Sequence, residues 1–375
     1  MLSTDDKQFK QYCKDFTTSK LFPLGAKYGE TEDIPKEVVE AMAEAKLFKL
    51  LLPQELGGDG ISSLRICLAR EQLAGVYCAA DVTLAMQGLG SYPISLVGTM
   101  VQKQKYLTKI CNGEILTTFA LTEPEAGSDV SAMSTEAMET ADGFVVNGVK
   151  RFISNGYTAN IAVLFAKTPT EKNPKAVSAF IVEKGMPGFD VHKRMKIIAP
   201  HDLVELKFEN CIVPKENLLG NIGEGLKIAL STLDVFRMSV GAAAMGIGQA
   251  ALDVAVTYAK RRVQFGKPIV KFQSTQFKLA EMATDLDAAR ALVYRAAIAK
   301  DKNGEHIPKV ASMAKYYATE AAFRIVDQAL QIHGGLGVVH GATVERLYRE
   351  IRALRIYEGT TEIQKLVIAK ALLEE

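Results

Sequence analysis

The chain changes from helical to strand-like periodicity and back again, and this change limits the possible folds more than any other feature. Residues from about 119 to 225 contain short apolar runs between turn residues, with strand-like stretches at 161–167, 177–183 and 203–213. Before and after this region the apolar residues recur at helical spacing. We therefore predict an α+β fold with three domains: an N-terminal α-helical domain (1–118), a middle antiparallel β domain (119–225) and a C-terminal four-helix bundle (226–375).

Turn and capping residues predict where single elements begin and end. Asn147-Gly148 lies between two apolar runs and is typical of a β-hairpin turn. One helix is expected from about 95 to 110, and two long helices are expected from about 226 to 262 and from 307 to 332.

The segment Gly246-Ile247-Gly248-Gln249-Ala250-Ala251 matches a GxGxxA pattern. A dinucleotide-binding fingerprint follows a strand and opens a helix. Here the pattern lies inside a continuous helical run, so close helix packing explains the glycines better. The sequence therefore does not indicate a nicotinamide cofactor.

Composition excludes several classes of protein. A net charge of +2 over 375 residues is too small to indicate a nucleic-acid partner or an anionic membrane surface. The five cysteines are scattered, which argues against both a disulfide framework and a metal site. The N-terminus lacks the pattern of a secretory or transit peptide, and no apolar run looks long enough to span a bilayer. We expect a cytoplasmic protein, with a mature mitochondrial matrix form as the alternative.

The segment from Arg355 to Gln364 is the strongest candidate for catalysis. Glu358 follows an apolar run, and Gly359 lets the backbone turn sharply behind it. Thr361 and Gln364 have the spacing of a capping box, which predicts the start of a new helix. In apolar surroundings the carboxylate would gain proton affinity and become a base for a weak carbon acid. The alternative is a solvated glutamate on a surface loop.

Four further segments have both a functional and a structural interpretation. The loop 119–130 offers hydroxyls and backbone N–H groups to a ring edge or a phosphate, or it is an ordinary turn. Phe152 in 151–156 flanks a planar group or packs in a core. Arg262 in 261–267 binds a pyrophosphate or complements a helix dipole. The glycines of 331–337 allow close backbone approach or form a tight turn, and His333 is more typical of a structural residue.

Taken together and in this order, these segments resemble the acyl-CoA dehydrogenase family over nearly the whole chain, as a member of short-chain or branched-chain type. The resemblance implies FAD, a homotetramer, and oxidation of an acyl-CoA thioester to its trans-2-enoyl-CoA, as in β-oxidation. Glu358 would take the α-proton while the flavin accepts the β-hydride, and electrons would pass to electron-transfer flavoprotein. An acyl-CoA oxidase, which is usually longer, and a non-catalytic protein on the same fold are the alternatives.

The resemblance also assigns roles to single residues. Residues expected to contact the flavin ring or its phosphates are Leu121, Thr122, Ser128, Phe152 and Ser154. Residues expected to hold the FAD of a neighbouring subunit are Arg262, Gln264, Phe265, Gln331, Gly335, Thr360 and Glu362. Residues expected to line the acyl-CoA site are Gln87, Ser128, Asp234, Phe236, Arg237, Tyr357 and Gly359.

Three departures from the family pattern bear on the substrate. Phe152 replaces a tryptophan that is common beside the flavin. Phe236 stands where some members carry the catalytic glutamate, and it cannot act as a base. The stretch Ile198–Asp202 departs from an Arg-Gly-Ser-like pattern. The bulk of Phe236 predicts a compact acyl group, which is short, branched or alicyclic rather than long and straight.

Overall fold

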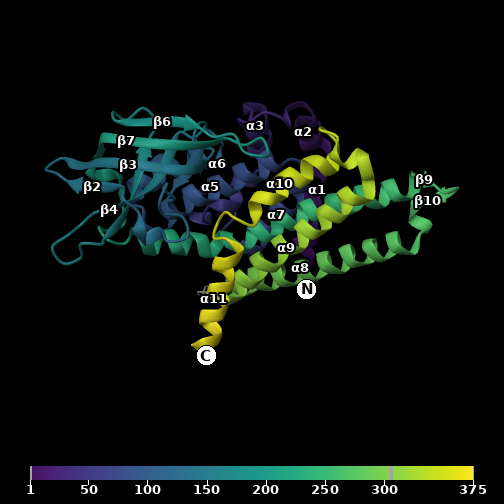
Figure 1. The fold of residues 1–375 in the computed structure, drawn as a ribbon. Helices are drawn as coiled ribbons and strands as arrows, with labels where there is room; N and C mark the ends of the chain where they lie inside the picture. Colours follow the sequence, from purple (N-terminus) through teal and green to yellow (C-terminus); the bar gives the residue numbers. More distant parts are fainter. Residues whose placement is uncertain (1, 304–306, 375) are drawn as a thin grey trace. The chain divides into compact units, whose positions relative to one another are not determined.

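The computed structural model describes residues 2–303 and 307–374 (Figure 1). It contains two compact units that are not continuous in sequence. Unit 1 comprises Met1–Lys27, Ser62–Asp81 and Arg237–Glu375, and unit 2 comprises Tyr28–Ile61 and Val82–Phe236. Three helices, α2, α5 and α7, contribute residues to both units. The predicted division into three domains remains a prediction.

Unit 2 is built around a mixed β-sheet in the order β6-β7-β3-β2-β4-β5-β8, with β1 paired to β4. Most pairs are antiparallel, but β1 and β2 both pair with β4 in parallel. The helices are α3 (Lys36–Glu44), α5 (Cys78–Val97) and α6 (Met100–Cys111). The strands are β1 (Thr117–Ala120), β2 (Glu136–Glu139), β3 (Gly143–Ser154), β4 (Ile161–Lys167), β5 (Val177–Glu183), β6 (Phe189–Arg194), β7 (Leu203–Pro214) and β8 (Leu218–Leu219).

The predicted hairpin at Asn147-Gly148 is wrong. Strand β3 continues through both residues, and the register against β7 shifts between Val146 and Gly148, which marks a β-bulge. A Cβ on Gly148 would lie 2.4 Å from the Thr135 hydroxyl, so the glycine allows a close approach of the chain. Asn147-Gly148 therefore forms part of a bulge rather than a hairpin turn, because β3 remains paired with β7 on both sides of it.

The predicted helix from 95 to 110 is also wrong at its start. Helix α5 ends at Val97, and α6 begins at Met100 after a break at Gly98-Thr99. The Thr99 side chain accepts a hydrogen bond from the Gln102 N–H, while the Gln102 side chain binds the Thr99 N–H. This capping box gives α6 its own N-terminus.

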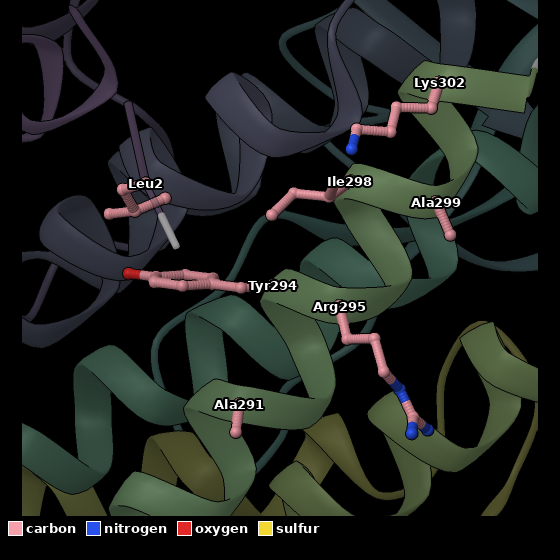
Figure 2. A pocket seen from close by; sticks show the side chains of 7 residues that line it. All are labelled: Leu2, Ala291, Tyr294, Arg295, Ile298, Ala299 and Lys302. Carbon is pink, nitrogen blue, oxygen red and sulfur yellow. The ribbon is translucent and has the colours of Figure 1, made fainter. Parts of the chain in front are cut away.

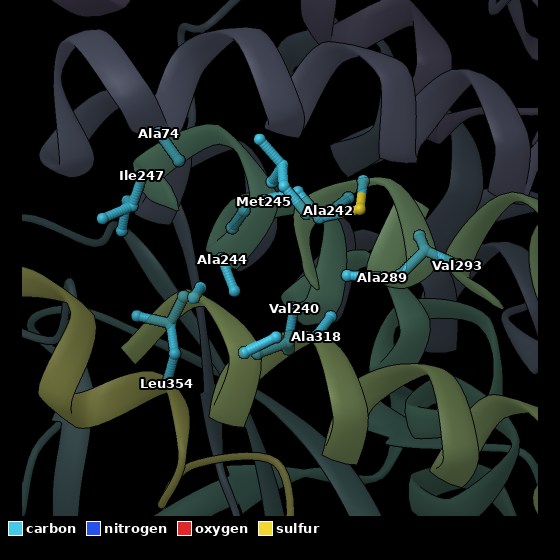
Figure 3. Close-up of a cluster of buried hydrophobic side chains, with 14 of the residues drawn as sticks. Ala74, Val240, Ala242, Ala244, Met245, Ile247, Ala289, Val293, Ala318 and Leu354 are labelled. Carbon is cyan, nitrogen blue, oxygen red and sulfur yellow. The ribbon is translucent and has the colours of Figure 1, made fainter. Parts of the chain in front are cut away.

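Unit 1 is a helical bundle whose core is rich in alanine (Figure 3). Small side chains such as Ala244, Ala289 and Ala318 let the helix backbones approach closely. The helices are α1 (Thr4–Phe16), α4 (Ser63–Val76), α7 (Gly225–Arg261), α8 (Gln273–Asn303), α9 (Pro308–His333), α10 (Thr343–Leu354) and α11 (Thr361–Leu373). The short α2 (Phe22–Tyr28) follows α1. The predicted α+β class, with helices before and after a β region, is confirmed.

Helix α7 corrects the expectation that no apolar run could span a bilayer. By length and composition alone, its 37 residues pass as a membrane span, with a mean hydropathy of 1.4 in the most apolar window. Most of that window, 61%, is buried inside the protein. Buried core helices commonly pass the same test, so the finding is weak evidence for a membrane.

The glycines of the GxGxxA segment provide a test of the packing interpretation. A Cβ on Gly246 would lie 2.1 Å from the Glu71 carbonyl oxygen on α4, whereas a Cβ on Gly248 would meet nothing closer than 3.5 Å. We expect Gly246→Ala to destabilise the protein by about 1–3 kcal/mol because the α4 backbone must shift. Gly248→Ala is the matched control and should be neutral or stabilising by up to about 1 kcal/mol, because alanine favours helix. Thermal unfolding measures both, and equal effects would contradict the assignment.

Candidate active site

Glu358 lies on the turn between α10 and α11, as the sequence predicts. Its backbone is left-handed with φ of 52°, and Gly359 follows with φ of 90°. A Cβ on Gly359 would lie 2.5 Å from the Gln364 side-chain nitrogen. A left-handed non-glycine residue costs free energy and persists only where its surroundings hold it. The turn is therefore a fixed feature of unit 1.

Helix α9 holds both ends and the middle of this turn. Glu320 accepts hydrogen bonds from Arg355 at 2.8 Å and from the Thr361 hydroxyl at 2.6 Å. The buried Lys315 ammonium donates to the Gly359 carbonyl oxygen at 2.7 Å. The segment on either side of Glu358 is thus tied to one rigid helix.

Helix α11 begins at Thr361, as predicted, but the predicted capping box of Thr361 and Gln364 is wrong. Thr360 is the N-cap of α11, and its side chain accepts from the Ile363 N–H. Gln364 instead donates to the carbonyl oxygens of Glu358 and Gly359, at 3.2 and 2.9 Å. The side chains of Thr361 and Gln364 therefore stabilise the turn instead of capping each other's backbone.

The carboxyl group of Glu358 has an unusual environment. Although the residue is half-buried overall, its Oε2 atom is buried and has no hydrogen-bond partner among the described residues. Burial raises the pKa of Glu358, while the charges of Arg70, Lys315 and Arg237 oppose that rise. A fully solvated surface glutamate is not what the structure shows. The site can hold a proton acceptor of increased basicity.

Sequence reasoning missed Arg70 and Lys315, two of the charged residues that act on Glu358. Arg70 is fully buried and binds Asp81 through two nitrogens, at 2.8 and 2.9 Å, and donates to the Ser239 hydroxyl at 2.8 Å. Burial lowers the pKa of Lys315 to about 8, with the charge of Glu358 acting in the opposite direction. These partners are far apart in sequence, so no local pattern indicates them.

Unit 2 carries the residues predicted to contact the flavin. Phe152 has a left-handed backbone with φ of 59° and is 54% exposed, because β3 is irregular between Lys150 and Ile153. Its ring is therefore not part of the sheet core, which contradicts the structural alternative. Nearby, the Arg151 N–H donates to the Thr122 carbonyl oxygen at 2.8 Å, and Leu121 is buried. The predicted loop and strand end thus adjoin each other within this unit.

Two further contacts in unit 2 were not anticipated. The buried Lys150 ammonium binds the Glu123 carboxylate at 2.7 Å and the Leu121 carbonyl oxygen at 3.0 Å. His201 lies within hydrogen-bond distance of the Ser154 hydroxyl, with Nε2 and Oγ 2.9 Å apart. The first contact fixes the predicted flavin loop, and the second gives the atypical stretch a partner.

The residues predicted for a neighbouring subunit's FAD lie on the surface of unit 1. Phe265 is 93% exposed in the short hairpin of β9 (Val263–Gln264) and β10 (Lys267–Pro268). Tyr258 stacks on His333 with ring centroids 4.3 Å apart, which brings the end of α7 beside the end of α9. The His333 Nδ1–H also bonds the Ala329 carbonyl oxygen, so this histidine has structural contacts. The exposed members of this set are Arg262, Gln264, Phe265, Gln331, Gly335 and Glu362, whereas Thr360 is half-buried.

The residues predicted for the substrate are mostly buried. Gln87 donates to the Ile110 and Ile115 carbonyl oxygens and accepts from the Thr117 N–H. Phe236 is 1% exposed and forms an edge contact with Tyr92, with ring centroids 6.2 Å apart. Asp234 and Arg237 are buried, Tyr357 and Gly359 are half-buried, and Ser128 is exposed.

Unit 1 has a surface groove that is lined by other residues (Figure 2). It has a volume of about 680 Å³ and is open to solvent along α8. Its lining residues are Leu2, Ala291, Tyr294, Arg295, Ile298, Ala299 and Lys302. None of them is a predicted site residue, and nothing in the structure indicates what covers this groove. Among the described residues, no cluster of His, Cys, Asp or Glu side chains could hold a metal ion.

Sequence models of one family match almost the whole chain in consecutive segments. They describe the acyl-CoA dehydrogenase N-terminal domain (residues 3–114), middle domain (118–211) and C-terminal domain (223–373). The chain belongs to the acyl-CoA dehydrogenase family. It is similar to a 3-(aryl)acrylate reductase of Clostridium sporogenes, with 42% identity over 97% of each chain. It is equally similar to the mitochondrial short-chain specific acyl-CoA dehydrogenase of Mus musculus, with 42% identity over 98% of this chain and 90% of the relative.

Solved structures give the same result. A structure described as an electron transferring flavoprotein of Acidaminococcus fermentans superposes with a TM-score of 0.95 at 40% identity, covering 100% and 99% of the two chains. Butyryl-CoA dehydrogenase of Megasphaera elsdenii superposes with a TM-score of 0.94 at 39% identity and the same coverage. An acyl-CoA dehydrogenase of Bacillus anthracis with FAD bound has a TM-score of 0.91 at 32% identity, covering 100% of this chain and 67% of that one.

This family member is a flavin-dependent oxidoreductase that acts on CH–CH bonds, and its cofactor is FAD. The residues present fit such a group. The Phe152 side chain is exposed on an irregular part of strand β3, and Ser154, which carries a hydroxyl, lies two residues further along the chain. An aromatic face beside a hydroxyl can accommodate a planar heteroaromatic ring.

The raised pKa of Glu358 predicts how the stability of the protein depends on pH. A carboxyl whose pKa is raised on folding stabilises the protein below its unfolded pKa, and this contribution is lost as the pH rises through the folded pKa. We therefore expect Glu358→Gln to gain in melting temperature relative to the wild type as the pH increases above the ordinary glutamate range. Thermal unfolding in excess FAD measures the difference. Glu281→Gln, exposed on α8, is the control, and a difference that shrinks with pH would contradict the prediction.

Proposed function

We propose that this chain oxidises an acyl-CoA thioester to its trans-2-enoyl-CoA with Glu358 as the base that removes the α-proton. One observation carries this proposal. The Glu358 carboxyl is held on a turn that α9 fixes, with a raised pKa and a buried oxygen that no described residue binds. A proton acceptor without a partner is what a carbon acid requires.

The backbone of the same residue can assist the reaction. No described residue accepts a hydrogen bond from the Glu358 N–H. A thioester carbonyl placed there would receive this bond as negative charge develops on its oxygen. Lys315 and Gln364 hold the Gly359 carbonyl oxygen, and Gln364 also holds the Glu358 carbonyl oxygen, so the backbone that carries the Glu358 N–H is restrained. Such pre-organisation lowers the cost of orienting the reacting groups.

FAD, when bound, supplies the acceptor for the hydrogen that leaves the β-carbon. We assign its ring and phosphates to Leu121, Thr122, Ser128, Phe152 and Ser154. We assign the remainder of a neighbouring subunit's FAD to Arg262, Gln264, Phe265, Gln331, Gly335, Thr360 and Glu362, in a homotetramer. The near-complete exposure of the Phe265 ring supports this arrangement, because the ring is accessible to a neighbouring chain.

We propose a compact acyl group for the substrate, with CoA near Ser128, Asp234 and Arg237. Phe236 fills space against α5, where a Cβ on Gly88 would lie 2.2 Å from its ring. Gln87, on the same helix, already uses its amide for three hydrogen bonds to the chain. A bulky ring beside a satisfied polar residue limits the depth available to a long chain. Tyr357 and Gly359, next to the base, complete the proposed acyl-CoA site.

Electron-transfer flavoprotein is the proposed redox partner, in a cytoplasmic β-oxidation type of reaction. A related structure carries that name, which supports the assignment over an oxidase that uses oxygen. The similarity to a 3-(aryl)acrylate reductase favours a second candidate function, the reduction of a 2-enoyl thioester by the same residues. In that direction Glu358 would donate the proton to the α-carbon. The ratio of forward to reverse rates with electron-transfer flavoprotein distinguishes the two directions.

Glu358→Gln tests the catalytic assignment. The amide is nearly isosteric but cannot accept the proton, so we expect turnover to fall by about 10²–10⁴-fold while the protein keeps its fold and FAD. Steady-state kinetics and the flavin absorbance measure these two properties. Glu281→Gln should retain wild-type turnover. A Glu358→Gln enzyme with close to wild-type turnover would show that another residue is the base.

The acyl group is tested by comparing kcat/KM for butanoyl-, isobutanoyl-, cyclohexanecarboxyl-, octanoyl- and palmitoyl-CoA. Each methylene that fits gains about 0.8 kcal/mol, so the preference should have a graded optimum among the compact substrates. Phe236→Ala should move the optimum towards longer chains. An optimum at octanoyl or longer in the wild type would contradict the proposal, and an unchanged optimum in Phe236→Ala would remove Phe236 from the pocket.

A further inference from the structure

The stretch Ile198–Asp202 contains a histidine that contacts a predicted flavin residue. His201 lies two residues before strand β7, and Ser154 is the last residue of β3. The two strands are paired there, with Ser154 opposite Leu203. The His201 Nε2 atom is 2.9 Å from the Ser154 Oγ atom. The histidine is therefore placed beside the serine hydroxyl by the register of the sheet.

Neighbouring hydrogen bonds hold both partners in place. The Asp202 carboxylate accepts from the Tyr157 and Thr158 N–H groups, at 3.2 and 3.0 Å, and the Asp202 carbonyl oxygen accepts from the Asn155 N–H at 2.8 Å. On the other side, the Thr118 hydroxyl donates to the Ser154 carbonyl oxygen at 2.7 Å. Hydrogen bonds thus hold the backbone on both sides of the contact, so the main-chain positions from which the imidazole and the hydroxyl project are restrained.

The chemistry of the pair follows from the ionisation state of the histidine. Burial lowers the pKa of His201 to about 4, so the ring is neutral near pH 7. A neutral imidazole has one N–H donor and one acceptor nitrogen. If Nε2 carries the hydrogen, it donates to Ser154 and leaves the serine hydrogen for another acceptor. If Nε2 is the acceptor, it binds the serine hydrogen, and the lone pairs of the serine oxygen can then accept a hydrogen bond from another donor. In either form the imidazole determines the direction in which the hydroxyl can bind a third group.

We propose that His201 is a positioning residue that orients the Ser154 hydroxyl towards the bound flavin. The proposal rests on the proposed function only for the assignment of Ser154 to the flavin site. It gives a role to the stretch that departs from the family pattern. In this role His201 acts through Ser154. A hydroxyl fixed in one direction favours one charge distribution on the ring it binds, so the pair influences both the affinity and the reduction potential of FAD.

The test uses His201→Phe, which keeps a ring but removes both nitrogens, and His201→Gln, which supplies an amide in place of the imidazole. Ser154→Ala and the double variant His201→Phe/Ser154→Ala complete a cycle. His192→Phe is the matched control, since His192 is 53% exposed on β6 of the same unit. The readouts are the Kd for FAD after reconstitution of the apoprotein, the visible flavin spectrum, and the midpoint potential of the bound flavin, all without substrate.

We expect His201→Phe and Ser154→Ala each to weaken FAD binding by roughly three- to tenfold, the range for one hydrogen bond. Both should shift the flavin spectrum and potential in the same direction. The double variant should be little worse than either single variant, and His201→Gln should recover part of the loss. His192→Phe should leave all three readouts unchanged. The wild-type Kd should be flat from about pH 6 to 8, because a histidine with a pKa of about 4 remains neutral there.

Two outcomes separate this inference from the proposed function. If Ser154→Ala leaves the spectrum, potential and Kd unchanged, Ser154 does not contact the flavin, and that part of the proposed function fails. If Ser154→Ala changes them but His201→Phe does not, or the two effects simply add, the positioning role of His201 is overturned. If His201→Phe fails to fold, His201→Ala gives the same readouts. None of these measurements depends on Glu358 or on turnover.

Discussion

The hydrogen bond from the Lys315 ammonium to the Gly359 carbonyl oxygen is the contact on which the candidate active site depends. A buried ammonium is costly unless it has a partner, so the bond is strongly favoured once α9 is in place. It holds the carbonyl oxygen of the residue after Glu358, directly beside the left-handed backbone of Glu358. The proton affinity of the carboxyl is then set by its depth in the protein and by the cations around it. Lys315 thus acts on the turn in two ways: it holds the backbone beside Glu358, and its charge opposes the rise in the pKa of the carboxyl.

The helical core of unit 1 makes this arrangement possible. Helix α9 is lined by alanines at the positions that face the core, and Gly246 brings α7 against α4 with no side chain between the backbones. Close backbones leave little room for adjustment, and a tightly packed interior transmits the position of one helix to its neighbours. Arg70, Asp81 and Ser239 form a buried polar group in the same unit, where all three find partners. The position of the turn at Glu358 therefore depends on the packing of the whole helical core of unit 1, and not only on the residues of the site.

The sequence was sufficient for features that depend on local pattern and insufficient for those that depend on distant partners. Strands β4 and β5 coincide with the predicted runs, and α7 and α9 lie within one residue of theirs, because periodicity and turn residues define them. The turn at Glu358 and Gly359 was predicted from a carboxylate before a glycine. Lys315 and His201 were not recognised, because a lysine on a helix or a histidine on a loop looks the same in sequence whether it is exposed or bound to a distant partner. The bulge at Gly148 was missed for a related reason, since it lies in the pairing with β7 and beside Thr135, both on other segments.

The irregular end of β3 has a consequence for how such a protein can diverge. Lys150 and Ile153 are buried in the sheet, whereas Phe152 between them is turned outwards by its left-handed backbone. The residue at this position can therefore change in size or polarity without disturbing the neighbours that stabilise the sheet. The residue that faces outwards, Phe152, and the residues that stabilise the sheet, Lys150 and Ile153, are different positions of one strand, so they can change independently. A lineage can then alter what this face binds while the scaffold behind it is inherited unchanged.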